Sequence, residues 1–175
     1  YNYILFFGFI RKYKGLDLLI DAMSNKLIDE RKIKLIIAGE FYENEKYYRQ
    51  KIHELNLSKS VIIFDRYISN NEVSKFFCAS DIIVQPYLSA TQSGISMIAL
   101  HFNRPVLATN VGGLSDYIKN NQNGYLVEPS SKKIVDSLLD FFDNKKSKVF
   151  EANIKLMKKQ YSWSNLVNSF ESIFK

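Results

Sequence analysis

The feature that most constrains this chain is a series of six short apolar runs separated by longer stretches with helical periodicity. The first two runs, YILFF at residues 3–7 and IKLIIA at residues 33–38, are each followed by glycine. Four more lie at residues 61–64, 81–85, 105–109 and 125–127. Because the runs are continuous rather than alternating, they predict strands that are buried on both faces, as in a parallel sheet.

Amphipathic helices are predicted between and after these strands. Leu16, Leu19 and Met23 recur at helical spacing, which predicts a helix from residue 16 to about residue 27. Ser69 and Glu72 have the spacing of a capping box and predict the start of another helix. Further helices are predicted near residues 48–55, 93–102, 114–119, 131–142 and 146–159, and from residue 163 to the end. The alternation predicts an α/β fold, a Rossmann-like three-layer domain with a six-stranded parallel sheet and a helical C-terminal extension.

Length and charge limit the class of protein. A chain of 175 residues is long enough for one well-buried domain. The net charge of +6 is scattered, which is not typical of a nucleic-acid binder, so we expect no nucleic-acid partner. One basic run stands out in the last third: Lys145, Lys146, Lys148, Lys155, Lys158 and Lys159. A solvated helix face is one reading, attraction to anionic lipid headgroups or an anionic acceptor is the other, and the sequence leaves both open.

Several classes of site receive no support. The one cysteine, Cys78, lies at the end of an apolar helix face, and we expect it to be buried and inert. His53 and His101 form neither a zinc pattern nor a nucleophile–base pair, and we expect no metal. No apolar run reaches transmembrane length, and the chain opens inside a predicted strand without methionine or a signal sequence. We therefore expect a fragment of a longer, cytoplasmic protein.

Residues 84–116 bring two strand ends and two helix starts close together. Helix N-termini that face the carboxyl edge of a parallel sheet are suited to phosphate. The segment SATQSG offers the side chains of Thr91, Gln92 and Ser93 and the amides around Ser93 and Gly94. Simple helix capping by Thr91 or Ser93 is the alternative, and both roles can hold together. We predict that a nucleotide's diphosphate binds here.

The loop GFIRKYKG, which follows the first strand, is a second candidate. It lacks the G-x-G-x-x-G pattern of dinucleotide sites and is not a Walker loop. It places Arg11 and Lys14 at a strand's carboxyl end, and Gly15 allows a tight entry into the next helix. The alternative is that both cations are solvated loop residues.

These segments together resemble a known family. FFGFIRKYKGLDLLIDA, LIIAGE, FDRYISNNEVSKFFCASDIIVQPY, NRPVLATNVGGLSDYI, NGYLVEP and QYSWSNLVNSFESIF follow one another in the order found in the group 1 retaining glycosyltransferases. The chain resembles their nucleotide-sugar-binding C-terminal domain. The resemblance implies a GT-B enzyme with two Rossmann-like domains, of which residues 1–175 are the second and the N-terminal acceptor domain is missing.

The resemblance also implies roles for single residues. Lys14 matches a lysine that contacts the donor diphosphate, and Arg11 is expected to replace an arginine that usually stands where this chain has Phe9. The family's two glutamates are replaced by Ala90 and Ile98, and SATQSGIS resembles an Ala-Thr-Gln-Ser-Gly variant. In that variant Gln92 is expected to contact the sugar, and Thr91, Ser93 and Gly94 the phosphates.

The base is expected near the ends of the second and third strands. The candidates are Gly39, Glu40, Arg66, Tyr67 and Ile68, with the backbone groups of Tyr67 and Ile68 favoured by the resemblance. Trp163 resembles a family marker, and we interpret it as a structural anchor of the last helix.

The resemblance implies transfer of a sugar from a nucleoside diphosphate sugar to an acceptor hydroxyl with retention, in surface polysaccharide or glycoconjugate synthesis. It implies a UDP-sugar as the default donor, no resident cofactor, a lipid-linked saccharide acceptor and peripheral membrane contact. The isolated domain is expected to be inactive. A GT-B sugar-nucleotide epimerase and a non-catalytic nucleotide-binding module stay open as alternatives.

Overall fold

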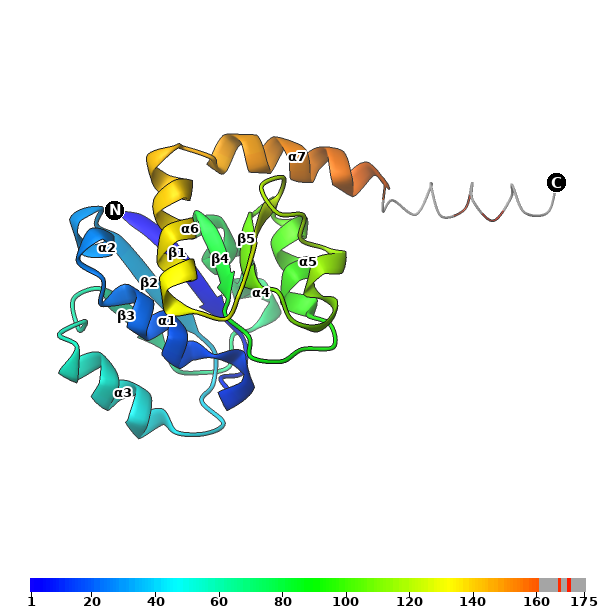
Figure 1. The fold of residues 1–175 in the computed structure, drawn as a ribbon. Helices are drawn as coiled ribbons and strands as arrows, with labels where there is room; N and C mark the ends of the chain where they lie inside the picture. The colour runs from blue at the N-terminus through cyan, green and yellow to red at the C-terminus, as the bar shows by residue number, and fades with distance from the viewer. Residues whose placement is uncertain (161–166, 168–169, 171–175) are drawn as a thin grey trace.

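The computed structural model describes residues 1–160, 167 and 170, and its centre is a six-stranded parallel sheet (Figure 1). The strands are β1 (Asn2–Phe7), β2 (Ile33–Ala38), β3 (Val61–Phe64), β4 (Ile82–Gln85), β5 (Val106–Thr109) and β6 (Gly124–Val127). Their order is β3-β2-β1-β4-β5-β6, and every neighbouring pair is parallel. This confirms the predicted Rossmann-like sheet.

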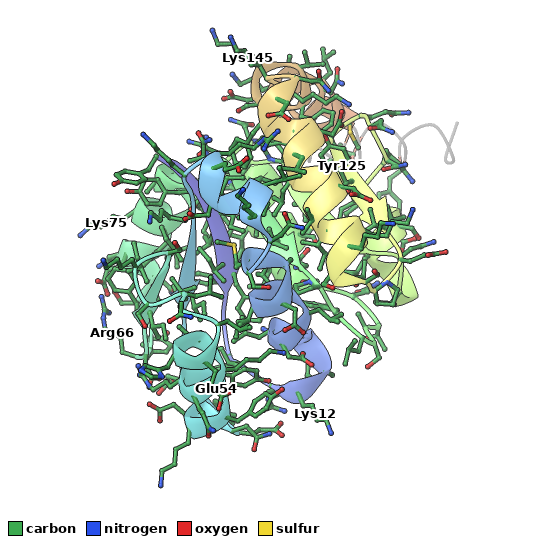
Figure 2. The ribbon with its side chains drawn as sticks, turned by 60° about the vertical axis from the view of Figure 1, so that its left-hand side comes forward. Lys12, Glu54, Arg66, Lys75, Tyr125 and Lys145 are labelled. Atoms are coloured by element: carbon green, nitrogen blue, oxygen red, sulfur yellow. The ribbon has the colours of Figure 1, made fainter. Side chains whose placement is uncertain are left out.

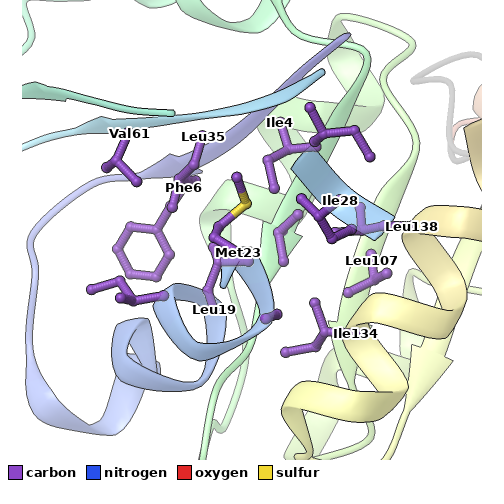
Figure 3. Close-up of a cluster of buried hydrophobic side chains, with 14 of the residues drawn as sticks. Ile4, Phe6, Leu19, Met23, Ile28, Leu35, Val61, Leu107, Ile134 and Leu138 are labelled. Carbon is purple, nitrogen blue, oxygen red and sulfur yellow. The ribbon is translucent and has the colours of Figure 1, made fainter. Parts of the chain in front are cut away.

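Helices cover both faces of the sheet and complete three layers. Ile4 and Phe6 face one core, while Leu5 and Phe7 face the other, so successive residues of β1 are buried on opposite sides. The first core, part of which Figure 3 shows, is covered by α1 (Leu16–Met23), α2 (Lys26–Glu30), α3 (Glu45–Glu54) and α6 (Ser131–Asp143). The second core is covered by α4 (Asn70–Ala79) and α5 (Gly94–His101).

The helix predicted from residue 16 to about residue 27 is two helices, so that prediction was wrong. α1 ends at Met23 and α2 begins at Lys26. The Ser24 hydroxyl donates to the carbonyl oxygen of Asp21 at 2.7 Å, and the Asn25 side chain accepts from the amide of Leu27 at 2.9 Å. These short polar side chains bond to the nearby backbone and so end one helix and start the next.

Three local expectations also differ from the structure. The helix predicted at residues 114–119 is a 3₁₀ segment, η2 (Gly112–Asp116). Cys78 is exposed rather than buried, because its neighbour Phe77 takes the core-facing side of α4. The helix predicted at Ser69 is present as α4, but the Ser69 side chain makes no capping bond and donates instead to Glu72 at 2.9 Å.

The C-terminal extension is helical, as predicted, in α6 and α7 (Ser147–Gln160). Phe150 of α7 is buried in the first core. The Lys158 ammonium donates to the carbonyl oxygen of His101 at 2.8 Å, which joins α7 to the end of α5. The helix predicted from residue 163 and the anchoring role of Trp163 lie outside the described residues.

The basic run of the last third is partly used inside the fold. Lys146 pairs with Asp140 at 2.6 Å and Lys155 with Glu151 at 3.4 Å. Lys145 projects at the end of the molecule opposite Lys12, which follows β1 (Figure 2). Lys145 and Lys146 thus lie in the turn between α6 and α7 and the rest of the run lies on α7, and both readings of the run stay predictions. Within the described part of the chain, no helix is both long and apolar enough to cross a membrane.

Candidate functional site

Two loops meet at the carboxyl edge of the sheet, where the strand order turns. β1 and β4 are neighbours at the middle of the sheet, and from them the order runs outward in opposite directions. The β1 loop (residues 8–15) and the β4 loop (residues 86–93) therefore follow adjacent strands, at the crevice where such sheets bind ligands. The amide of Leu88 donates to the carbonyl oxygen of Tyr13 at 2.7 Å and ties the two loops together.

Two glycines fix the shape of these loops. Gly15, with φ +64°, stands at the entry to α1, where an added Cβ would clash with the carbonyl oxygen of Pro86. Gly112, with φ +52°, supports the β4 loop from η2, where an added Cβ would clash with the carbonyl oxygen of Ala90. The tight helix entry expected at Gly15 is confirmed, and any larger residue at either position would push the loops apart.

A cleft of about 590 Å³ lies between the two loops and the start of α5. Its lining residues are Tyr13, Lys14, Tyr87, Ser89, Ala90, Thr91, Gln92, Ser93, Gly94, Ile95 and Ile98. The structure thus brings together Lys14 and all four residues expected at the donor phosphates and sugar, although they come from segments about 80 residues apart.

Lys14 is the buried cation of this cleft. Its side chain is only 7% exposed, and no described carboxylate lies within ion-pair distance of it. The ammonium lies 5.7 Å from the ring centre of Tyr87 and close above Gly8. Burial, helped by the nearby charge of Arg11, lowers the pKa of Lys14 to about 8. A cation held in this way gains more from an anionic ligand than a solvated lysine does.

The N-terminus of α5 opens into the same cleft. Ser93 is its N-cap residue, but the Ser93 side chain makes no capping hydrogen bond. A Cβ added to Gly94 would meet nothing within 4 Å, so the backbone there borders open space. Unpaired amides at a helix N-terminus carry a partial positive charge that attracts anions. Lys14 and α5 therefore present positive charge to the cleft from two sides.

A second cavity, of about 280 Å³, adjoins the first. Lys14, Ile95 and Ile98 line both cavities, so these side chains border the two cavities at once. The other lining residues are Phe7, Gly8, Phe9, Gly39, Glu40, Tyr67, Ile68, Asn70 and Val73. Four residues predicted to bind the base, Gly39, Glu40, Tyr67 and Ile68, therefore lie in one place, next to the first cavity.

Two arginines named in the sequence analysis lie elsewhere. Arg11 lines neither cavity, and its exposed guanidinium lies 4.8 Å from the ring centre of Tyr42. Its assignment to the diphosphate stays a prediction. Arg66 pairs with Glu72 at 2.6 Å, which raises the pKa of Arg66 and lowers that of Glu72 to about 2. That pair holds the start of α4, outside both cavities.

Sequence reasoning missed the groups behind the cleft wall. Gln85 is buried at the end of β4, where its side-chain nitrogen donates to the Ser93 hydroxyl at 2.7 Å and reaches the Tyr87 hydroxyl at 3.3 Å. The Ser96 hydroxyl donates to its carboxamide oxygen at 2.7 Å. Burial raises the pKa of the Tyr87 hydroxyl. A glutamine that ends an otherwise apolar strand was the signal in the sequence.

The two apolar residues that replace the family's glutamates do lie in the cleft. Ala90 and Ile98 line the larger cavity, and no carboxylate lines it among the described residues. Glu40 is the carboxylate that lines the smaller cavity. The larger cavity is thus a neutral and basic cradle suited to anions.

Comparison with known proteins shows what this arrangement is similar to. The model of the family described as "Glycosyl transferases group 1" matches residues 1–157. The lipopolysaccharide 1,2-N-acetylglucosaminetransferase of Salmonella typhimurium is 27% identical over 98% of this chain and 48% of its own length. The chain spans less than half the length of the first curated relatives that it matches.

Solved structures share the fold. The C-terminal domain of the group 1 family protein LpcC of Francisella tularensis has a TM-score of 0.82 and 28% identity, covering 93% of this chain and 87% of that one. Anabaena HepE, in complex with UDP, has a TM-score of 0.76 and 18% identity, covering 98% of this chain and 49% of that one.

Proposed function

Since this chain belongs to the group 1 glycosyl transferases, we propose that it is the donor-binding half of a two-domain GT-B enzyme. The parent protein transfers a sugar from a nucleoside diphosphate sugar to an acceptor hydroxyl, and residues 1–175 hold the donor. An N-terminal domain completes the cleft and binds the acceptor. The division is supported by the relatives, whose length is more than twice that of this chain.

The observation that carries the proposal is the meeting of Lys14 with the uncapped start of α5 in one cleft. A diphosphate brings the negative charge that a buried ammonium lacks, and its oxygens accept hydrogen bonds from backbone amides. As the bond between sugar and phosphate breaks, negative charge builds on the leaving diphosphate. Lys14 and the amides near Gly94 then stabilise it more strongly than they stabilise the intact donor.

The remaining cleft residues fit the parts of a nucleotide sugar. Thr91 and Ser93 flank the phosphate position, and Gln92, whose amide both donates and accepts, contacts the sugar. The base enters the smaller cavity, where backbone groups of Tyr67 and Ile68 recognise it. Lys14 borders both cavities, which suits a diphosphate that links the ribose to the sugar.

We extend the proposal to retention of the anomeric configuration. No described carboxylate lines the larger cavity, so this half of the site offers no nucleophile for a covalent sugar intermediate. With retention, which the family resemblance implies, the acceptor oxygen has to form its bond on the face of the sugar from which the diphosphate departs. The proton released by the acceptor passes to the departing phosphate oxygen, which balances the exchange.

UDP is the first nucleotide to test, because HepE, which shares the fold, was solved in complex with UDP. We propose a lipid-linked saccharide as the acceptor and a role in surface polysaccharide or glycoconjugate synthesis. The support is the Salmonella relative, whose name is lipopolysaccharide 1,2-N-acetylglucosaminetransferase. Such an acceptor would bring the parent protein into peripheral contact with a membrane.

The test is a thermal-shift screen of the 175-residue chain against UDP-, GDP- and ADP-sugars, followed by transfer assays with the full-length parent. A donor at about 100 times its Kd should raise the melting temperature by about 5–10 °C. The chain alone should bind without turnover, and the parent should transfer the sugar with retention. Robust turnover by the chain alone, or no nucleotide binding at all, contradicts the proposal.

A non-catalytic nucleotide-binding module is the second candidate, favoured by Ala90 and Ile98 in place of carboxylates. Tight binding by a parent protein that transfers nothing to any acceptor would select it. A sugar-nucleotide epimerase would need acid and base carboxylates at the sugar, and no described carboxylate lines the larger cavity.

A further inference from the structure

Ser93 holds the capping position of α5 without capping it. Its backbone is extended, with φ −136° and ψ 114°, as an N-cap residue requires. A serine in this place usually accepts a hydrogen bond from the amide two or three residues further on. Here the hydroxyl oxygen accepts from the side-chain nitrogen of Gln85 at 2.7 Å, and the cap is not made.

The position of Gln85 explains why Ser93 does not cap α5. It is 1% exposed, and a buried carboxamide must find hydrogen-bond partners. All of its side-chain partners belong to the cleft wall or to α5: Ser93, Tyr87 and Ser96. Ser93 and Tyr87 line the cleft, and the Lys14 ammonium lies over the Tyr87 ring. One buried amide therefore fixes groups on both positive sides of the site.

We propose that Gln85 is a positioning residue that draws the Ser93 hydroxyl away from α5 and so keeps the first amides of the helix free for a diphosphate. The ligand part of this inference rests on the proposed function. Without Gln85, the Ser93 hydroxyl turns to the amide of Ile95 and caps the helix, whereas the Ser96 amide already donates to the Ser93 carbonyl oxygen at 3.2 Å. A phosphate oxygen must then displace that cap before it can bind at Gly94.

A buried glutamine that only stabilises the core would have the same contacts, so the test must separate the two roles. Gln85→Met keeps the length of the side chain and removes its hydrogen bonds. UDP affinity, measured by calorimetry on the 175-residue chain, should fall about tenfold, the strength of one cap. In combination with Ser93→Ala, which leaves no hydroxyl to cap the helix, the same change should cost less than about twofold.

The decisive comparison is between the loss of UDP affinity that Gln85→Met causes in the wild-type chain and the loss that it causes in the Ser93→Ala chain. An equal loss of affinity with and without Ser93→Ala overturns the proposal, because a purely structural role does not depend on the Ser93 hydroxyl. Urea unfolding of each variant shows whether it is folded.

A second measurement needs no ligand, and its wild-type part needs no variant. Hydrogen exchange of the Ile95 amide, followed by NMR, should be fast in the free wild-type chain and slower in Gln85→Met. Strong protection of the Ile95 amide in the free wild-type chain overturns the proposal, even if Gln85→Met does not fold. If UDP does not bind at all, the proposed function fails, while this exchange measurement still tests the role of Gln85.

Discussion

The two loops that form the cleft contribute to it in different ways. The β1 loop brings a charge, the buried ammonium of Lys14, whereas the β4 loop brings neutral side chains and the start of α5. On the first side the site depends on an ion that the fold has partly desolvated. On the second side it depends on backbone shape and on open space beside Gly94. Changes on the two sides should therefore affect stability and binding differently.

On the β1 side, burial of the charged Lys14 ammonium is unfavourable for folding. Burial lowers the pKa of Lys14 from its ordinary value of 10.5 to about 8, so the folded chain disfavours the charged form. That difference corresponds to a cost on the order of 3 kcal/mol at neutral pH, when Lys14 is charged in both states. In the proposed complex, a bound diphosphate would offset this cost. Function and stability are thus opposed at Lys14.

The largest expected effect is that of Lys14→Met. UDP affinity should fall about 100-fold, because a charge-assisted contact to phosphate is lost. The free energy of unfolding of the ligand-free chain should rise by about 1–3 kcal/mol, because an unpaired buried charge is removed. Calorimetry with UDP and urea unfolding measure the two quantities.

Lys12→Met is the matched control. Lys12 lies on the same 3₁₀ turn, η1 (Lys12–Lys14), but is exposed and does not line the larger cleft. It should change UDP affinity by less than about threefold and leave stability within about 0.5 kcal/mol. If the two variants lose affinity equally, general attraction rather than a buried contact explains binding, and the contrast between the loops fails.

Gly94→Ala probes the β4 side and should have the next largest effect. The added methyl group meets no atom within 4 Å in the free chain, so stability should be unchanged or rise by about 0.5 kcal/mol. UDP affinity should nevertheless fall about 30-fold, because the methyl group occupies space taken by the phosphate. The same titration on Met97→Ala, an exposed α5 position that lines neither cavity, provides the control. Unchanged UDP affinity in Gly94→Ala would place the diphosphate elsewhere.

Much of the fold could be predicted from the sequence because it depends on patterns of burial. Apolar runs such as IKLIIA predict a strand, and the structure has one at each predicted place, although the edge strand β3 leaves Ile62 and Phe64 exposed on one face. The break between α1 and α2 could not be read in the same way. There, Ser24 and Asn25 bond to the local backbone within a stretch whose apolar spacing continues.

The site was predictable where it depends on backbone and less so where it depends on long-range contacts. Lys14 could be found because a glycine after a strand fixes the loop that carries it. Gln85 was missed because its partners lie up to 11 residues further on, across a loop whose path the sequence does not specify. The position of Arg11 was equally hidden, since it depends on Tyr42, which follows a different strand.

The pH dependence of UDP affinity should distinguish the β1 loop, which carries Lys14, from the β4 loop. We expect UDP affinity to change by about tenfold. Lys14 has a lowered folded pKa of about 8, so between that pH and 10.5 the unfolded chain binds more protons than the folded chain. Stability should therefore rise with pH in this window. UDP affinity should fall in the same window, because free Lys14 loses the proton that the complex needs. Lys14→Met should show neither trend between pH 7 and pH 9.5, and a persisting trend would assign it to another group.

Arg11→Ala should have the smallest effect and decides whether the β1 loop supplies one cation or two. With its guanidinium over the Tyr42 ring, Arg11 acts on the cleft only through its field. UDP affinity should then fall about threefold at low salt and be unchanged at about 1 M salt, where exposed charges are screened. Removing this like charge should also raise the pKa of Lys14 and shift the pH profile upward. A loss above about 30-fold that persists in high salt would instead mean that Arg11 leaves Tyr42 and binds the diphosphate directly, as the family resemblance implies.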